Sequence, residues 1–197
     1  ARRQRQMCIR DSRKTSMGMD EHRLSDILHA SQIKATDIYE TPPQIIWIDN
    51  STIATLGNFS ASTGKAKSKK TFNVSALVAA SLAGKQVLNY RAHLPEGKQR
   101  ILYVDTEQSR FHCRSVLERI LRLAGLPTTT DPENLDFFCL REYSLSVRIE
   151  VIDYALRQQK GYGLVIIDGI RDLMLDINNA GESVEVINRM MEWSSRY

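Results

Sequence analysis

The pattern of hydrophobic and polar residues alternates between a period typical of strands and one typical of helices. Short apolar runs predict five strands, at residues 45–48, 53–63, 101–104, 135–140 and 164–167. Apolar residues at i, i+3 and i+4 spacing predict four helices, at residues 72–87, 109–123, 145–160 and 182–194. Strands that alternate with helices of this length predict an α/β fold with a mostly parallel sheet and helices on both of its faces.

The two ends of the chain differ from this regular middle. Residues 1–41 form a basic N-terminal segment with one short amphipathic helix within residues 22–35, and Pro42-Pro43 separates this segment from a core at residues 42–197. Residues 1–12 resemble translated sequencing-adapter read-through, so we expect them not to belong to the natural protein. The last helical pattern reaches Tyr197 without a stop signal, so we expect the C-terminal part of the core to be missing.

Composition excludes several classes of protein. The 197 residues are 42% hydrophobic and 25% charged, close to the average of globular domains. No apolar run is long enough to cross a bilayer and no secretory signal is present, so we expect a cytoplasmic protein with no membrane partner. The cysteines, Cys8, Cys113 and Cys139, share no CxxC spacing, which argues against a zinc site or a disulfide framework. The net charge of +4 weakly favours a polyanionic partner.

A lysine-rich loop precedes the first predicted core helix. It reads Gly64-Lys65-Ala66-Lys67-Ser68-Lys69-Lys70-Thr71 and lies between a predicted strand and a predicted helix, as a Walker A phosphate-binding loop requires. We expect these eight residues to bind nucleotide phosphates, with Lys70 at the β- and γ-phosphates and the Thr71 hydroxyl on Mg²⁺. Lys69 stands where glycine is usual, so its side chain must point away from the phosphates or add a second cation. The alternative is a basic surface loop.

Two carboxylates follow predicted strands in the order that a P-loop ATPase needs. Asp168 ends a run of four apolar residues, which is the Walker B pattern and predicts a Mg²⁺ ligand, although an aspartate there is often only a helix cap. Glu107 lies just past the strand at 101–104 and is the candidate to orient or deprotonate the attacking water. Asp105 is the competing acid, because it lies two residues earlier and deeper in the sheet. A surface position is the alternative for Glu107.

From about Pro42 to Tyr197 the chain resembles the RecA-like ATPase domain of the RepA/DnaB type, found in plasmid and mobile-element replication helicases. The segments that carry the resemblance are TLGNF, GKAKSKKTF, YVDTEQS and LVIIDGIRDL. It implies a RecA-like P-loop fold, ATP and Mg²⁺ as cofactors, DNA as partner with single strands favoured, and a homo-oligomer such as a hexameric ring. It carries over Lys70 and Thr71 as Walker A residues, Glu107 as the catalytic glutamate and Asp168 as Walker B.

The same resemblance places a DNA-facing loop at Arg171–Gly181. The composition of this loop is acidic, so a plain solvated turn is the alternative. Two other functions remain open. Lys65 directly after Gly64 is similar to the second lysine of the ParA and MinD partition ATPases, although the glycines that follow it there are absent here. The crowding of lysines, with Lys69 in place of glycine, also fits a nucleotide-binding regulatory subunit without turnover.

Overall fold

The structure is a computed structural model that describes residues 21–65, 68–176 and 178–197. Contacts divide the chain into two compact units, Ala1–Thr41 and Pro42–Tyr197. In the first unit, residues 21–31 are helical, so the helix begins one residue before the predicted range of 22–35 and ends four residues before its end. Among the described residues, no helix combines the length and the apolar character that a membrane crossing requires.

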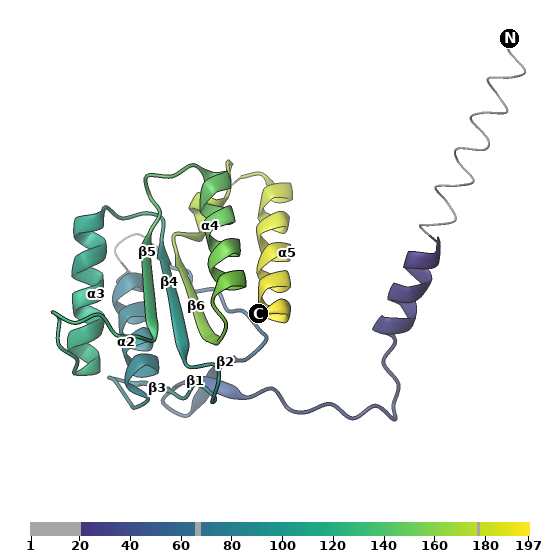
Figure 1. The fold of residues 1–197 in the computed structure, drawn as a ribbon, viewed down its shortest axis with the longest axis horizontal. Helices are drawn as coiled ribbons and strands as arrows, with labels where there is room; N and C mark the ends of the chain where they lie inside the picture. Colours follow the sequence, from purple (N-terminus) through teal and green to yellow (C-terminus); the bar gives the residue numbers. More distant parts are fainter. Residues whose placement is uncertain (1–20, 66–67, 177) are drawn as a thin grey trace, which may run out of the picture. The chain divides into compact units, whose positions relative to one another are not determined.

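The second unit is built on a parallel sheet of three strands, β4 (Arg100–Asp105), β5 (Leu135–Cys139) and β6 (Tyr162–Asp168). The strand order is β5-β4-β6, so β4 lies at the centre (Figure 1). In the register of the sheet, Asp105 lies opposite both Cys139 and Asp168. The carboxyl ends of the strands therefore meet at one edge, and side chains that follow β4 and β6 are close together.

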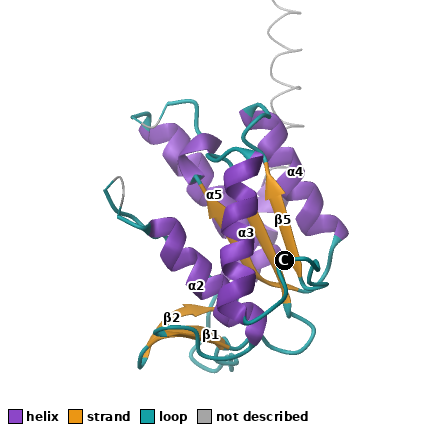
Figure 2. Cartoon of the chain, turned by 90° about the vertical axis from the view of Figure 1, so that its left-hand side faces the viewer, coloured by secondary structure: helices purple, strands orange, loops and turns teal. Residues whose placement is uncertain are grey.

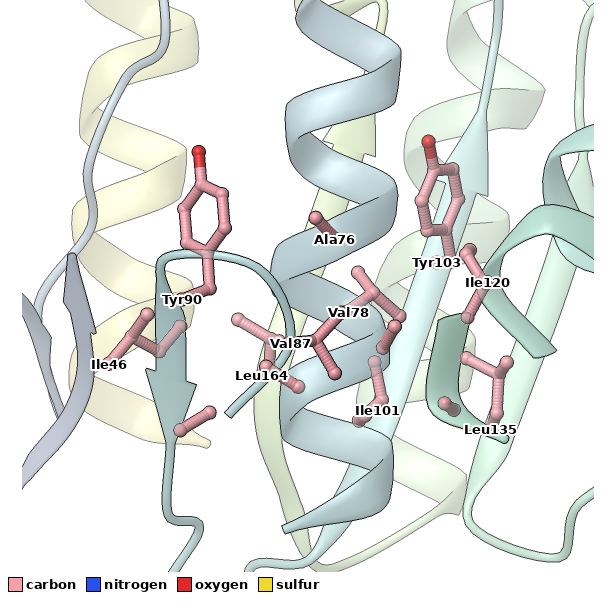
Figure 3. Close-up of a cluster of buried hydrophobic side chains, with 14 of the residues drawn as sticks. Ile46, Ala76, Val78, Val87, Tyr90, Ile101, Tyr103, Ile120, Leu135 and Leu164 are labelled. Atoms are coloured by element: carbon pink, nitrogen blue, oxygen red, sulfur yellow. The ribbon is translucent and has the colours of Figure 1, made fainter. Parts of the chain in front are cut away.

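Alternate residues of β4 support two separate cores. Ile101 and Tyr103 pack with α2 (Lys70–Ala83) and α3 (Arg110–Ala124), and Figure 3 shows Tyr103 near Ile120 of α3. Leu102 and Val104 pack against α4 (Leu145–Gln158) and α5 (Ala180–Arg196) on the other face. Figure 1 shows these helix pairs on opposite sides of the strands, and in Figure 2 α3 crosses in front of the sheet. The predicted α/β layers with helices on both faces are confirmed.

Glycine and serine set the ends of the helices. α3 begins after Ser109 and ends at Gly125, whose φ of 77° is left-handed and whose N–H donates to the carbonyl of Arg122. These ends agree with the predicted helix at 109–123. α2 ends at Ala83, four residues before the predicted end, because Gly84 has a φ of 60° and stops the helix.

A smaller antiparallel sheet, of order β2-β1-β3, packs with α2 and was only partly predicted. β1 (Gln44–Ile48) matches the predicted strand at 45–48, whereas β3 (Tyr90–Ala92) was not expected. The predicted strand at 53–63 is wrong beyond its first residues, because β2 spans Ser51–Thr55 and residues 58–65 are irregular. Gly57 has a φ of 75°, which turns the chain out of the strand at this point.

Candidate functional site

The lysine-rich loop reaches α2 as irregular backbone. It does not follow a strand directly, so that part of the prediction is wrong; β2 ends at Thr55. Ala66 and Lys67 lie outside the described residues. α2 begins at Lys70 with no acidic residue in its first turn and, among the described side chains, no side-chain cap. The positive end of the helix dipole is therefore left for a negative group from outside the helix.

Lys70 is hydrogen-bonded to the backbone of the lysine-rich loop. Its Nζ donates to the carbonyl oxygens of Gly64 at 3.0 Å and Lys65 at 3.3 Å, so the ammonium group lies over the loop backbone. Both acceptors are neutral carbonyls on an exposed loop, and an anion at the start of α2 would be a stronger partner for this cation. The lysine is thus held near the place where an anion would bind.

Lys69 adopts a backbone conformation that favours glycine. Its φ of 60° and ψ of 29° lie in the left-handed region, where a side chain meets its own backbone. This explains in physical terms why glycine is usual at this point of a phosphate-binding loop. The Lys69 side chain lines an open hollow of about 420 Å³ together with Thr71, Phe72 and Arg119.

Thr71 and Asp168 meet although they are 97 residues apart in the chain. The Thr71 hydroxyl donates to Asp168 Oδ2 at 3.1 Å, and the Tyr103 hydroxyl donates to the same oxygen at 3.0 Å. Asp168 ends β6, so the sheet brings the Walker B candidate to the first turn of α2. A hydroxyl and a carboxylate at one point form a set of oxygen donors that suits Mg²⁺.

Tyr103 was missed by the sequence reasoning. It is fully buried in β4 and its ring stacks on Phe137 with centroids 4.3 Å apart. Burial, and then the nearby charge of Asp168, raises the pKa of its phenol far above the ordinary value, so it remains a hydrogen-bond donor to Asp168. A tyrosine inside a strand buried on both faces needs a polar partner, and that signal could have identified it.

Glu107 lies beside Asp168 because the ends of β4 and β6 are joined. The Thr106 N–H donates to the carbonyl of Asp168 at 3.0 Å, and the Thr106 hydroxyl donates to the carbonyl of Gly169 at 2.8 Å. Glu107 is an exposed residue, as the alternative of a surface position expects, but its carboxyl is partly desolvated. The pKa of Glu107 is raised, first by this partial desolvation and then by the charges of Asp168, Asp172 and Asp105, and Lys70 opposes this shift. A carboxylate with a raised pKa is better able to accept a proton. Sequence reasoning did not predict the contribution of Asp172.

Asp105, the competing acid, has a local structural task. It is fully buried, and its Oδ1 accepts the backbone N–H groups of Glu107 at 3.0 Å and Gln108 at 2.7 Å. Its Oδ2 accepts the side-chain amide of Gln108 at 2.9 Å. Both oxygens are therefore engaged in the turn that carries Glu107, and the geometry favours Glu107 as the acid that faces an incoming ligand.

Gly169 permits the close approach of the two strand ends. Its φ is 104°, and a Cβ atom there would lie 2.3 Å from Thr106 Oγ1 and 2.6 Å from Glu107 Cγ. Any larger residue would push Glu107 away from Asp168. The sequence contained this signal in the glycine directly after Asp168, but its steric reason appears only in the structure.

The site provides few direct protein ligands for a metal. Within residues 21–65, 68–176 and 178–197, no group of three or more His, Cys, Asp or Glu side chains forms a metal site by itself. Mg²⁺ commonly binds through one or two protein groups and completes its shell with water and phosphate oxygens. Thr71 and Asp168 fit that mode, with Lys70 and Glu107 beside them.

The Arg171–Gly181 segment is more ordered than a plain loop. Its first residues belong to a 3₁₀ helix, Ile170–Leu173, and its last two begin α5; Ile177 lies outside the described residues. Glu182 of α5 accepts the N–H of Asp176 at 2.9 Å, and Asn179 caps α5 by accepting the N–H of Gly181. Asp176 and Asn179 of this segment are therefore hydrogen-bonded to the first turn of α5.

A family model described as an AAA domain matches residues 24–197, which is most of the chain. The match includes the lysine-rich loop, the Glu107 turn and the end of β6. No curated protein and no solved structure matches the chain.

Proposed function

Because the chain belongs to the AAA-domain family of P-loop ATPases, we propose that it binds and hydrolyses ATP with Mg²⁺ at the site described above. The observation that carries the proposal is the 3.1 Å hydrogen bond from Thr71 to Asp168. It joins the first turn of α2, which follows the phosphate-binding loop, to the end of β6, and Thr71 and Asp168 would hold the metal ion there. Lys70 and Glu107 lie beside this point.

Each residue has a separate role in this proposal. The N-terminus of α2 and the remaining residues of loop 64–71 bind the phosphates, and Lys70 exchanges the carbonyls of Gly64 and Lys65 for phosphate oxygens. Thr71 and Asp168 would hold Mg²⁺, which neutralises charge on the β- and γ-phosphates. Tyr103 positions Asp168 by donating to its Oδ2. Glu107 orients the attacking water and accepts its proton.

The proposed biological role is that of a RecA-like motor acting on single-stranded DNA, of the replicative-helicase type found in plasmids and mobile elements. The sequence resemblance to the RepA/DnaB type, carried by segments of the core from about Pro42 to Tyr197, supports this. A homo-oligomer such as a hexameric ring is part of the same proposal.

ATP turnover measured with and without single-stranded DNA tests this role. We expect turnover to rise with DNA and to require Mg²⁺, and Lys70→Ala should remove both the basal and the stimulated rates. Turnover that DNA does not change would contradict the motor role while leaving the ATPase intact. The mass of the protein in solution with ATP tests the homo-oligomer, and a monomer under those conditions would oppose it.

Lys69 favours a second candidate, a nucleotide-binding regulatory subunit without turnover. Its left-handed backbone and its extra charge beside Lys70 distinguish this loop from the usual glycine-containing form. ATP binding with no hydrolysis, with or without DNA, would favour this function. Restored hydrolysis in Lys69→Gly would identify Lys69 as the cause.

A further inference from the structure

Two free cysteines from different elements meet at the turn that carries Glu107. Cys113 lies in the first turn of α3, and Cys139 is the last residue of β5. Both thiols donate to the backbone carbonyl oxygen of Gln108, the Cys139 thiol at 3.3 Å and the Cys113 thiol at 3.7 Å. The fold therefore brings together, at one acceptor, two thiols that are far apart in the sequence.

The two thiols differ in their access to solvent. Cys113 is 4% exposed, whereas Cys139 is half-buried, so a small oxidant reaches the Cys139 sulfur first. Burial raises the pKa of the Cys113 thiol, followed by the charge of Asp105 and the neighbouring Cys139 thiol, which agrees with sulfur atoms that lie close together. A thiol with a raised pKa is a poor first nucleophile, and this also assigns the first reaction to Cys139.

We propose that Cys113 and Cys139 form a reversible disulfide when peroxide is present, and that this disulfide switches off the hydrolysis of ATP at the neighbouring site. The effect on hydrolysis rests on the proposed function. The disulfide itself does not, because it requires only the two cysteines.

The oxidation balances with hydrogen peroxide as the oxidant. The Cys139 sulfur attacks one peroxide oxygen, so that an S–O bond forms, the O–O bond breaks, and the other oxygen leaves as water with the thiol proton. The Cys113 sulfur then attacks the sulfur of this sulfenic acid, so that the S–S bond forms, the S–O bond breaks, and the second oxygen leaves as water. Asp105 lies beside the Cys113 thiol and can take up its proton during this second attack. The two thiols lose two electrons, and one peroxide is reduced to two molecules of water.

The disulfide changes the turn that carries Glu107. A disulfide has no S–H group, so the Gln108 carbonyl loses both of the hydrogen bonds that the thiols donate to it. The new bond also joins the first turn of α3 to the end of β5. Because Glu107 directly precedes Gln108, we expect its carboxylate to move from its place beside Asp168. A displacement of about 1 Å can lower the rate of a reaction about 10²-fold.

Peroxide treatment of the Cys8→Ser protein tests the proposal, because Cys113 and Cys139 are its two remaining cysteines. We expect peptide mass spectrometry without reduction to find the disulfide between them, and dithiothreitol to remove it. ATP hydrolysis should fall at least about tenfold in the oxidised protein, and dithiothreitol should restore it. ATP binding should stay within about threefold, because loop 64–71 is not altered.

Cys139→Ser in the same Cys8→Ser background is the matched control. Serine keeps a hydroxyl donor for the Gln108 carbonyl but cannot form a disulfide, so peroxide should leave the hydrolysis of this variant unchanged. An equal loss of hydrolysis in this variant would show that oxidation of other residues is the cause, and the switch would be wrong.

The remaining outcomes separate the disulfide from the proposed function. If peroxide yields sulfinic acids, or a disulfide between two copies of the chain, the pairing of Cys113 with Cys139 is contradicted and the ATP site stands. If the disulfide forms and hydrolysis does not change, the switch is contradicted and the proposed function stands. If the untreated protein binds no ATP and does not hydrolyse it, the proposed function fails and the switch fails with it, while mass spectrometry still decides whether the disulfide forms.

Discussion

At the scale of single residues, the electrostatics of Glu107 predict that the proposed hydrolysis of ATP depends on pH. Its pKa is raised by partial desolvation and by Asp168, Asp172 and Asp105, so this carboxylate binds a proton at a higher pH than an ordinary glutamate does. In a plot of kcat/KM against pH, the fall on the acid side (the acid limb) reports ionisations of the unliganded enzyme. We therefore expect kcat/KM for ATP to fall, as the pH is lowered, at a pH above the ordinary glutamate pKa of about 4.3.

Asp172→Asn checks the cause of this shift. It removes one of the negative charges that raise the pKa of Glu107, so the acid limb should move to lower pH. Glu150→Gln removes an exposed carboxylate on α4 and should leave the limb in place. An acid limb that is the same in all three proteins would show that Asp172 does not act on Glu107.

Lys69 carries a second residue-scale prediction. Because an L-residue in the left-handed region costs about 1–2 kcal/mol, and glycine adopts it without that cost, Lys69→Gly should raise the free energy of unfolding by about 1 kcal/mol. Lys85→Gly is the matched control. Lys85 is also exposed but lacks a positive φ, so glycine there should lower stability by up to about 1 kcal/mol. Urea denaturation of both variants measures the difference, and equal losses would refute the backbone argument.

At the scale of elements, the junction of β4 and β6 decides whether Glu107 and Asp168 lie together. Gly169→Ala places a Cβ atom 2.6 Å from Glu107 Cγ and 2.3 Å from Thr106 Oγ1, in a residue with a φ of 104°. We expect a loss of about 3 kcal/mol or more of stability, or a displaced Glu107 turn with much reduced hydrolysis. Gly97→Ala is the control, because Gly97 has a φ of 75° and no atom within 4 Å of an added Cβ. Similar losses in stability and activity for both variants would mean that crowding at Gly169 has no special effect.

The elements also show how far the sequence could predict this site. The strands at 101–104 and 164–167 were predictable because they are continuous apolar runs. The position of the acidic residues at the ends of these strands was therefore predictable as well. The segment before the loop was mispredicted as a strand, because its apolar pattern continues past Gly57 while the backbone turns there. Tyr103 and Asp172 were missed, because their contacts join elements that are distant in sequence.

At the scale of the whole molecule, the α/β layers follow from the alternation of apolar and polar positions. β4 presents Ile101 and Tyr103 to one pair of helices and Leu102 and Val104 to the other, and each of these four side chains is at most 1% exposed. Full burial of such a side chain stabilises the fold by about 1.5–3 kcal/mol. The small antiparallel sheet was less predictable, because the three residues of β3 give too short a pattern to read.

The same core holds the site in place. α2 packs on β4 through one apolar face, and its first turn reaches the carboxyl ends of β4 and β6. The loop, Glu107 and Asp168 are therefore brought together by the packing of the whole core and not by any one segment. The fold is consistent with the family match to a P-loop ATPase. The proposed roles of the single residues all serve one step, the attack of a water molecule oriented by Glu107.

Glu107→Gln tests that step most directly, by measuring ATP binding and ATP hydrolysis on the same protein. The amide keeps the size of the side chain but cannot accept a proton from water. We expect ATP to bind within about threefold of the unaltered protein and hydrolysis to fall by about 10²–10⁴-fold. Hydrolysis equal to that of the unaltered protein would contradict the role given to Glu107 and would leave Asp105 as the candidate for the acid that orients the water.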